Sequence, residues 1–160
     1  GLCGGFQILG RAITDPHEIE STAGRIRGLG VLPVTTVLAE EKTLRRVSGT
    51  HLPSGREIHG YEIHHGETQT GEAVVAVEAE DGRMLVAASP GAPVWGTYVH
   101  GIFDADGFRR WFIDRLRQRR GLSPLDEPQT TYDLDPAFDR LAEVVRKSLD
   151  LDRIFDLMGV

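Results

Sequence analysis

The sequence holds a single cysteine, Cys3, among its 160 residues. One thiol can form neither an internal disulfide nor a cysteine-rich zinc site, and this usage favours a reducing, cytoplasmic setting. No apolar run approaches the roughly 20 residues that span a bilayer. The first residues also lack the charged and apolar regions of a targeting signal. We therefore expect a cytoplasmic protein with no membrane partner.

Positive charge is also scarce. Lys and Arg together number 18 against 24 Asp and Glu, which gives a formal net charge of −6. This balance argues against general nucleic-acid binding. The apolar share of 40% and the charged share of 26% are typical of a globular protein and argue against disorder. A chain of this length suits one domain that buries its own core.

The middle of the chain reads as β-structure. Valine-, leucine- and threonine-rich or alternating stretches predict strands at 29–38, 73–79, 83–88 and 94–100, and more polar alternation marks 42–50 and 57–64. Asp81 and Gly82 form a strong hairpin turn between two of these strands. At the start, Phe6, Leu9 and Ile13 fall at helical spacing, and we expect Asp15-Pro16 to end that helix.

The end of the chain reads as helix. Phe108, Trp111, Phe112 and Leu116 give one apolar helix face, which Gly121 is placed to end. Asp135-Pro136 is typical of an N-cap followed by proline at the first helical position. That start opens a second amphipathic helix with Phe138, Leu141, Val145 and Leu149, and a third short helix covers 151–158.

Cys3 lies in the segment Gly1-Leu2-Cys3-Gly4-Gly5. A nucleophile on a strained turn into a helix needs small neighbours, because the backbone packs closely while the side chain points outward. The helix that follows favours the reactive thiolate, and the N–H of Gly4 is placed to stabilise an oxyanion. The alternative, a buried inert cysteine, fits less well between glycines.

A catalytic cysteine needs a base, usually histidine. Of the six histidines, His100 stands out because it ends the apolar segment Val94–Val99 and precedes Gly101. Functional groups gather at the carboxyl ends of strands in open α/β sheets. The alternative is a histidine whose ring is satisfied by the backbone.

His64 and His65 form a further dense patch in the segment Gly60–Gly66. Adjacent residues in a strand point to opposite faces, so these two side chains cannot easily share one metal ion. We expect a structural hydrogen-bonding role for them and no metal site.

Five collinear segments together resemble class I glutamine amidotransferases, and more narrowly the subgroup of the cobyric acid synthase type. They are Gly1–Gly10, Asp15–Ser21, Gly28–Val34, Gly60–Gly66 and Gly96–Asp104. The resemblance covers essentially the whole chain, including its helical tail. It implies an α/β fold: a partial class I amidotransferase (flavodoxin-like) three-layer sandwich with a β-rich middle and a helical C-terminus.

The resemblance also implies a reaction. Cys3 attacks the side-chain amide of glutamine, a thioester forms, ammonia leaves, and water releases glutamate. His100 takes the thiol proton and protonates the ammonia, and Gln7 matches a position that contacts bound glutamine. The ammonia then amidates four carboxylates of the corrinoid adenosylcobyrinic acid a,c-diamide. That step belongs to a synthetase domain with ATP and magnesium, while residues 1–160 need no cofactor of their own.

Two features depart from the family pattern. Many class I amidotransferases carry glutamate two residues after the catalytic histidine, whereas this chain has Ile102. The cobyric acid synthase subgroup lacks that acid as well. What orients His100 stays open between Glu62, Asp104 and a backbone carbonyl.

The second departure is length. The chain looks like the C-terminal portion of an amidotransferase domain, cut just before the elbow and without the synthetase domain. We therefore expect residues 1–160 alone to be a weak glutaminase, because only Gly4 supplies an oxyanion donor.

Three rival interpretations remain. One is the glutaminase subunit of a peptidoglycan-precursor amidating enzyme, which shares the elbow. Another is a non-catalytic module that binds a partner. The third is nucleic-acid binding through the arginines between Arg109 and Arg120, although that stripe has the pattern of the solvated face of an amphipathic helix.

Overall fold

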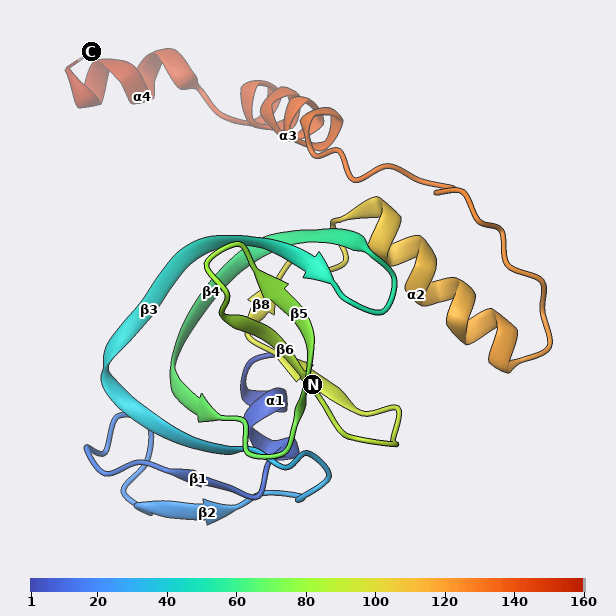
Figure 1. The fold of residues 1–160 in the computed structure, drawn as a ribbon. Coiled ribbons are helices and arrows are strands. Elements are labelled where there is room, and N and C mark those ends of the chain that lie inside the picture. Colours follow the sequence, from blue (N-terminus) through green and yellow to red (C-terminus); the bar gives the residue numbers. More distant parts are fainter. Residues whose placement is uncertain (160) are drawn as a thin grey trace. The chain divides into compact units, whose positions relative to one another are not determined.

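The computed structural model describes residues 1–159, which divide into two compact units, the first covering Gly1–Gln129 and the second beginning at Thr130. The first unit contains α1 (Gly4–Leu9), β1 (Ala12–Thr14), β2 (Arg25–Arg27), β3 (Thr35–His51), β4 (Arg56–Gln69), β5 (Val74–Ala79), β6 (Met84–Ala88), β7 (Trp95–Thr97), β8 (Val99–His100) and α2 (Asp106–Arg119). The second contains α3 (Asp135–Ser148) and α4 (Leu151–Met158). The α/β class, the β-rich middle and the helical C-terminus are thus confirmed (Figure 1).

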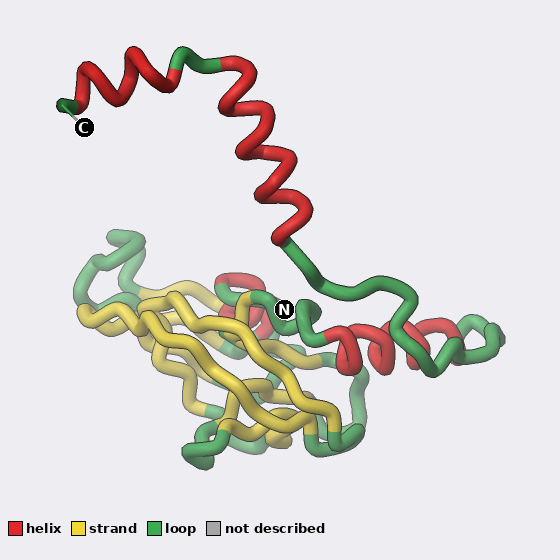
Figure 2. The backbone as a smooth tube through the Cα atoms, turned by 90° about the horizontal axis from the view of Figure 1, so that it is seen from above, coloured by secondary structure: helices red, strands yellow, loops and turns green. Residues whose placement is uncertain are grey.

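The strands form one eight-stranded sheet in the order β2-β1-β3-β5-β6-β7, in which β4 also pairs with β3 and β8 pairs with β4. Most pairs are antiparallel, and β1 runs parallel to β3. The long strands β3 and β4 curve around the sheet's interior (Figures 1 and 2), and their register shifts between Leu38 and Thr43. An irregularity of this kind bends a strand and strengthens its twist.

The larger core cluster lies between the sheet and α2. Ile58, Val77, Val99, Ile102 and Phe108 are each at most 3% exposed. Helix α2 presents the aromatic face that its sequence spacing predicts, and Gly121, with φ 73°, follows its last residues. The backbone N–H of Gly121 returns to the carbonyl of Gln118. Helix α2 is therefore fixed to the sheet by aromatic and aliphatic packing.

A smaller core cluster anchors α1. Phe6 is 2% exposed and packs edge-on against Tyr98, with Leu32 and Val34 beside it. A methyl group at Gly96 would overlap the Phe6 ring, so only glycine lets β7 pass this close to α1. This packing fixes the helix that follows Cys3 against the strand that leads to His100.

Several local predictions are wrong at the edges of elements. Helix α1 ends at Leu9, and Ile13 belongs to strand β1 although it fits the helical spacing. Gly10 takes an extended conformation, which stops the helix well before Pro16. The strand predicted over 29–38 begins only at Thr35, and the one predicted over 94–100 is interrupted at Tyr98.

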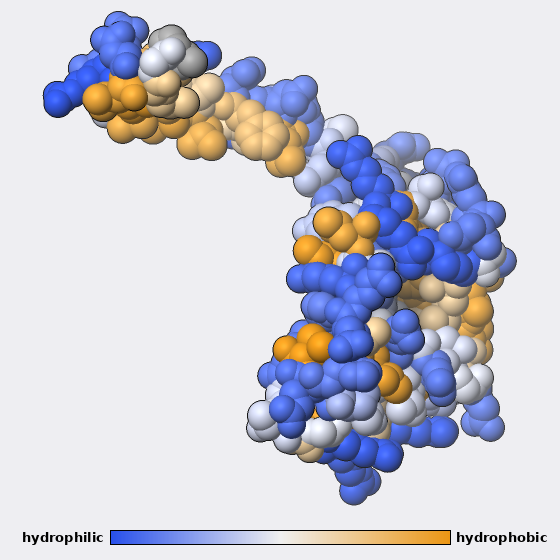
Figure 3. All heavy atoms as spheres, turned by 90° about the vertical axis from the view of Figure 1, so that its left-hand side faces the viewer, coloured by the Kyte–Doolittle hydropathy of each residue, from blue (hydrophilic) through white to orange (hydrophobic). Residues whose placement is uncertain are grey.

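In the second unit, Leu134 is the N-cap of α3, one residue before the predicted Asp135, and Pro136 lies in the first turn. In α4, the Asp150 side chain accepts a hydrogen bond from the Arg153 N–H as an N-cap. Both helices expose apolar side chains along one side (Figure 3), including Phe138, Leu141 and Phe155. Within residues 1–159, no helix is both long and apolar enough to cross a bilayer.

Candidate active site

Cys3 occupies a strained turn at the start of α1. Its backbone has φ 50° and ψ −117°, a region that residues with a side chain rarely adopt, and it is the N-cap of the helix. Such strain persists only where surrounding structure holds it, and it clusters at functional sites. Cys3 N–H donates to Thr97 O at 2.9 Å, and Leu2 forms a parallel bridge with Thr97. The predicted turn into a helix at Cys3 is therefore present.

The first backbone N–H groups after Cys3 differ in their hydrogen bonds. Gly5 donates to Leu2 O at 2.8 Å, and Phe6 donates to Cys3 O at 2.8 Å. The N–H of the first helical residue, Gly4, has no acceptor within its own helix. This donor directly follows the sulfur-bearing residue, which is the position that an oxyanion donor takes in a nucleophile elbow.

His100 lies at the end of β8, three residues after Thr97. It is opposite Tyr61 of β4, and the two rings stack with centroids 5.2 Å apart. Its Nε2 atom is buried and has no hydrogen-bond partner within the described part of the chain. The Cys3 sulfur contacts the carbonyl oxygen of Ile63 at 4.0 Å. The fold thus brings Cys3 and His100 to adjoining ends of two paired segments.

Gln7 is held in a chain of side-chain hydrogen bonds. Its Nε2 donates to Tyr98 Oη at 3.4 Å, Tyr98 Oη pairs with Thr68 Oγ1 at 2.7 Å, and Thr68 pairs with Thr36 at 2.8 Å. Burial raises the pKa of Tyr98, so the phenol stays protonated. Gly66 lies against this chain, and a methyl group there would overlap Tyr98 Oη and Gln7 Nε2.

His64 packs against this chain of hydrogen-bonded side chains through Tyr98. Its ring stacks on Tyr98 with centroids 3.7 Å apart, and its Nδ1 lies 2.8 Å from the carbonyl oxygen of Gly66. The neighbouring His65 instead places Nδ1 3.0 Å from Ala39 O. The structural hydrogen bonds predicted for both residues are therefore present. Sequence reasoning missed the stacking on Tyr98, which joins residues 34 positions apart.

Glu62 is buried and pairs with two arginines. Its Oε2 accepts from Arg45 Nε at 2.9 Å and from Arg83 at 3.2 Å, while its Oε1 lies 3.9 Å from His64 Nε2. Glu62 lies directly opposite Val99, whereas His100 lies opposite Tyr61, so alternation places Glu62 and His100 on different faces of the strand pair. Glu62 therefore engages the arginines and approaches His64.

The loop around Asp15 lies near Gln7, across a small cavity. The Asp15 carboxylate accepts hydrogen bonds from the backbone N–H groups of Ile19, Glu20 and Ser21 at 2.8–2.9 Å. Burial alone would raise the pKa of Asp15, but these three donors hold it below its ordinary value. A cavity of about 120 Å³ opens between this loop and Gln7. The loop thus shapes a small hollow beside α1.

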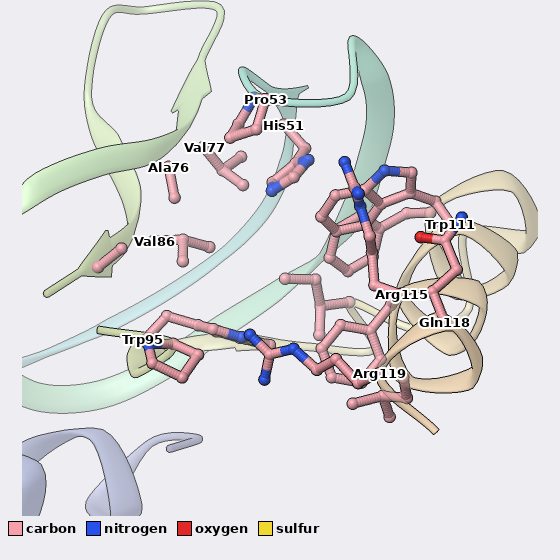
Figure 4. Close-up of a pocket in the computed structure, with 16 residues that line it drawn as sticks. His51, Pro53, Ala76, Val77, Val86, Trp95, Trp111, Arg115, Gln118 and Arg119 are labelled. Atoms are coloured by element: carbon pink, nitrogen blue, oxygen red, sulfur yellow. The ribbon is translucent and has the colours of Figure 1, made fainter. Parts of the chain in front are cut away.

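A larger cavity, of about 590 Å³, lies elsewhere, between the sheet and α2. Figure 4 shows it lined by Val77, Val86, Trp95 and Trp111, with Arg115 at its edge. Its lining includes neither Cys3 nor His100. Among residues 1–159, no group of three His, Cys, Asp or Glu residues could hold a metal ion.

Several arginines of α2 bind within the chain. Arg110 pairs with Asp114, Arg109 pairs with Asp106, and Arg115 lies over the Trp111 ring at 5.5 Å. These arginines therefore pair with neighbouring side chains of α2, as is typical of residues three or four positions apart on a helix.

A strained cysteine at a helix start and a histidine at the end of a short strand that follows Thr97 form the candidate site. Comparison with known proteins gives the family: residues 1–108 match the CobB/CobQ-like glutamine amidotransferase domain. The chain belongs to this family.

Curated relatives match the chain from end to end. It is 45% identical over 161 residues to the adenosylcobalamin biosynthesis bifunctional protein CobDQ of Leptospira interrogans, covering 100% of this chain and 19% of that protein. It is 42% identical over 192 residues to the cobyric acid synthase of Nitratidesulfovibrio vulgaris, covering 100% and 35%. It is 39% identical over 163 residues to the cobyric acid synthase of Clostridium acetobutylicum, covering 100% of this chain and 33% of that protein. The chain thus spans about a third or less of each relative.

Proposed function

We propose that this chain is the glutaminase part of a cobyric acid synthase and supplies ammonia for cobalamin biosynthesis. The observation that carries the proposal is the strained Cys3, bonded through its N–H to Thr97 three residues before His100. The names of the relatives support a corrinoid as the acceptor of the ammonia, and they favour this function over peptidoglycan-precursor amidation.

In the proposed mechanism, the Cys3 sulfur attacks the side-chain amide carbon of glutamine. His100 accepts the thiol proton, and the Gly4 N–H donates to the oxyanion. As the carbon–nitrogen bond breaks, His100 returns the proton and ammonia leaves, with a thioester on Cys3. Water then attacks the thioester, and its hydrolysis releases glutamate and restores the thiol.

The remaining parts of the proposal lie beyond these residues. Ammonia passes to the synthetase part of the longer enzyme, where ATP and magnesium support amidation of four carboxylates of adenosylcobyrinic acid a,c-diamide. Residues 1–160 form part of a glutaminase domain, with Gln7 as a contact for the bound glutamine. The setting is the cytoplasm.

Cys3→Ser in the complete enzyme tests this proposal. Glutamine-dependent amidation should fall to background, while amidation driven by added ammonia should remain, because the synthetase part needs only the nitrogen. The matched control is Ser89→Ala, which lies in the loop before β7. Glutamine use retained in Cys3→Ser contradicts the proposal.

A further inference from the structure

The His64 side chain is about nine-tenths buried, yet its Nε2 has no hydrogen-bond partner among the described residues. Buried polar atoms are nearly always paired, because an unpaired one keeps its full desolvation cost. The nearest charged oxygen, Glu62 Oε1, is 3.9 Å away, which is too far for a hydrogen bond. The Nε2 atom therefore needs a partner that protein atoms do not supply.

The other ring nitrogen shows which kind of partner fits. Nδ1 lies 2.8 Å from the Gly66 carbonyl, and a carbonyl only accepts, so Nδ1 carries the hydrogen. In the neutral ring Nε2 is then an acceptor. Burial lowers the pKa of His64, and the Glu62 charge only partly opposes this. A positive charge on His100 lowers the same pKa further. Nε2 thus stays an acceptor when His100 takes up a proton.

The contacts of His64 involve the residues to which the proposed function assigns glutamine binding and attack. The ring lies flat on Tyr98, whose hydroxyl accepts from Gln7. The peptide carbonyl just before His64, that of Ile63, is the group that the Cys3 sulfur contacts. Stacking on Tyr98 and the bond to Gly66 also fix the direction of the ring, so Nε2 is preorganised.

We propose that His64 Nε2 accepts a hydrogen bond from the side-chain amide N–H of bound glutamine and thereby selects glutamine over glutamate. The inference rests on the proposed function. The carboxylate of glutamate has no N–H, so its oxygen lone pairs would face a buried acceptor. A site built to pair one polar group rejects an analogue that lacks it, because the buried group is left unpaired. Glutamate, the reaction product, is expelled by the same contact.

The test measures glutamine and glutamate affinities by calorimetry in the complete enzyme carrying Cys3→Ser, which binds without turnover. His64→Phe keeps a ring to stack on Tyr98 and removes both nitrogens. His64→Gln places an amide there, which can accept from glutamine or donate to glutamate. His65→Phe is the matched control, since its ring contacts Ala39 instead.

In His64→Phe we expect glutamine to bind about tenfold more weakly and glutamate to be unchanged. In His64→Gln we expect glutamate to bind about tenfold more tightly than in the parent, a gain that misfolding cannot produce. His65→Phe should keep the parental ratio. A parental glutamine-to-glutamate ratio in His64→Gln overturns the inference.

The two proposals fail differently. Turnover of glutamine by Cys3→Ser, or no glutamine binding by the parent, overturns the proposed function and this inference with it. An inactive Cys3→Ser enzyme with an unaltered ratio in His64→Gln overturns the role of His64 alone.

Discussion

The backbone N–H of Cys3 donates to the carbonyl oxygen of Thr97 at 2.9 Å, and Thr97 N–H donates to Gly1 O at 3.0 Å. These two bonds tie the residue before the elbow helix to the strand that leads to His100. The proposed nucleophile and its proposed base lie in segments far apart in the sequence, and one short parallel pairing joins these segments. Misplacement of such groups by about 1 Å can cost about 100-fold in rate.

The backbone strain at Cys3 gives the first prediction. Glycine adopts positive φ without a side-chain clash, so Cys3→Gly should raise the free energy of unfolding by about 1–3 kcal/mol relative to Cys3→Ala. Both variants should lack glutaminase activity. Urea unfolding of the two proteins measures the difference, and equal stabilities would show that the turn carries no strain.

Gly66 gives the second prediction. A methyl group there overlaps Tyr98 Oη and Gln7 Nε2, so Gly66→Ala should destabilise the protein by about 1–3 kcal/mol and raise the KM for glutamine. Gly107→Ala in α2 is the control, because its methyl group meets Arg56 atoms only at ordinary contact distance and helices favour alanine. A Gly66→Ala variant as stable as Gly107→Ala contradicts the packing described.

How far the sequence predicts this site follows from which contacts are local. Glycines beside Cys3 indicate the strained turn, because that signal lies within five residues. The spacing of Ile13 fits a helix, so the sequence alone predicts the wrong state, because pairing of β1 with β3 makes Ile13 part of a strand. The stacking of His64 on Tyr98 joins distant segments, so a one-dimensional pattern shows only two adjacent histidines and a nearby glycine.

Asp15 gives a prediction about pH. Its pKa in the folded protein is lowered, so its stabilising effect is complete above the ordinary pKa of aspartate and is lost as pH falls through the lowered value. The stability difference between the parent and Asp15→Asn should therefore be large at neutral pH and shrink below about pH 4. Thermal unfolding of both proteins from about pH 2 to about pH 7 measures this stability difference, because carboxylates titrate within that range. A difference independent of pH would show that the carboxylate charge is unimportant, and the exposed Glu57→Gln is the control.

The pairing of Glu62 with Arg45 and Arg83 gives a further prediction. Glu62→Gln weakens charge-assisted hydrogen bonds to Arg45 and Arg83, so it should destabilise the fold by about 1–3 kcal/mol. Since Glu62 and His100 lie on different faces of the strand pair, the rate of thiol alkylation at Cys3 should change little. A loss of Cys3 reactivity as large as that of His100→Ala would instead make Glu62 the group that orients the base.

The most direct test of the Cys3–His100 assignment is labelling with an electrophilic glutamine analogue, followed by peptide mass spectrometry of the complete enzyme. We expect one label, on Cys3, that glutamine blocks and that His100→Ala slows by about 100-fold or more. His65→Ala should label at the parental rate. Labelling at full rate in His100→Ala, or glutamine turnover in an enzyme whose Cys3 stays unlabelled, would contradict it.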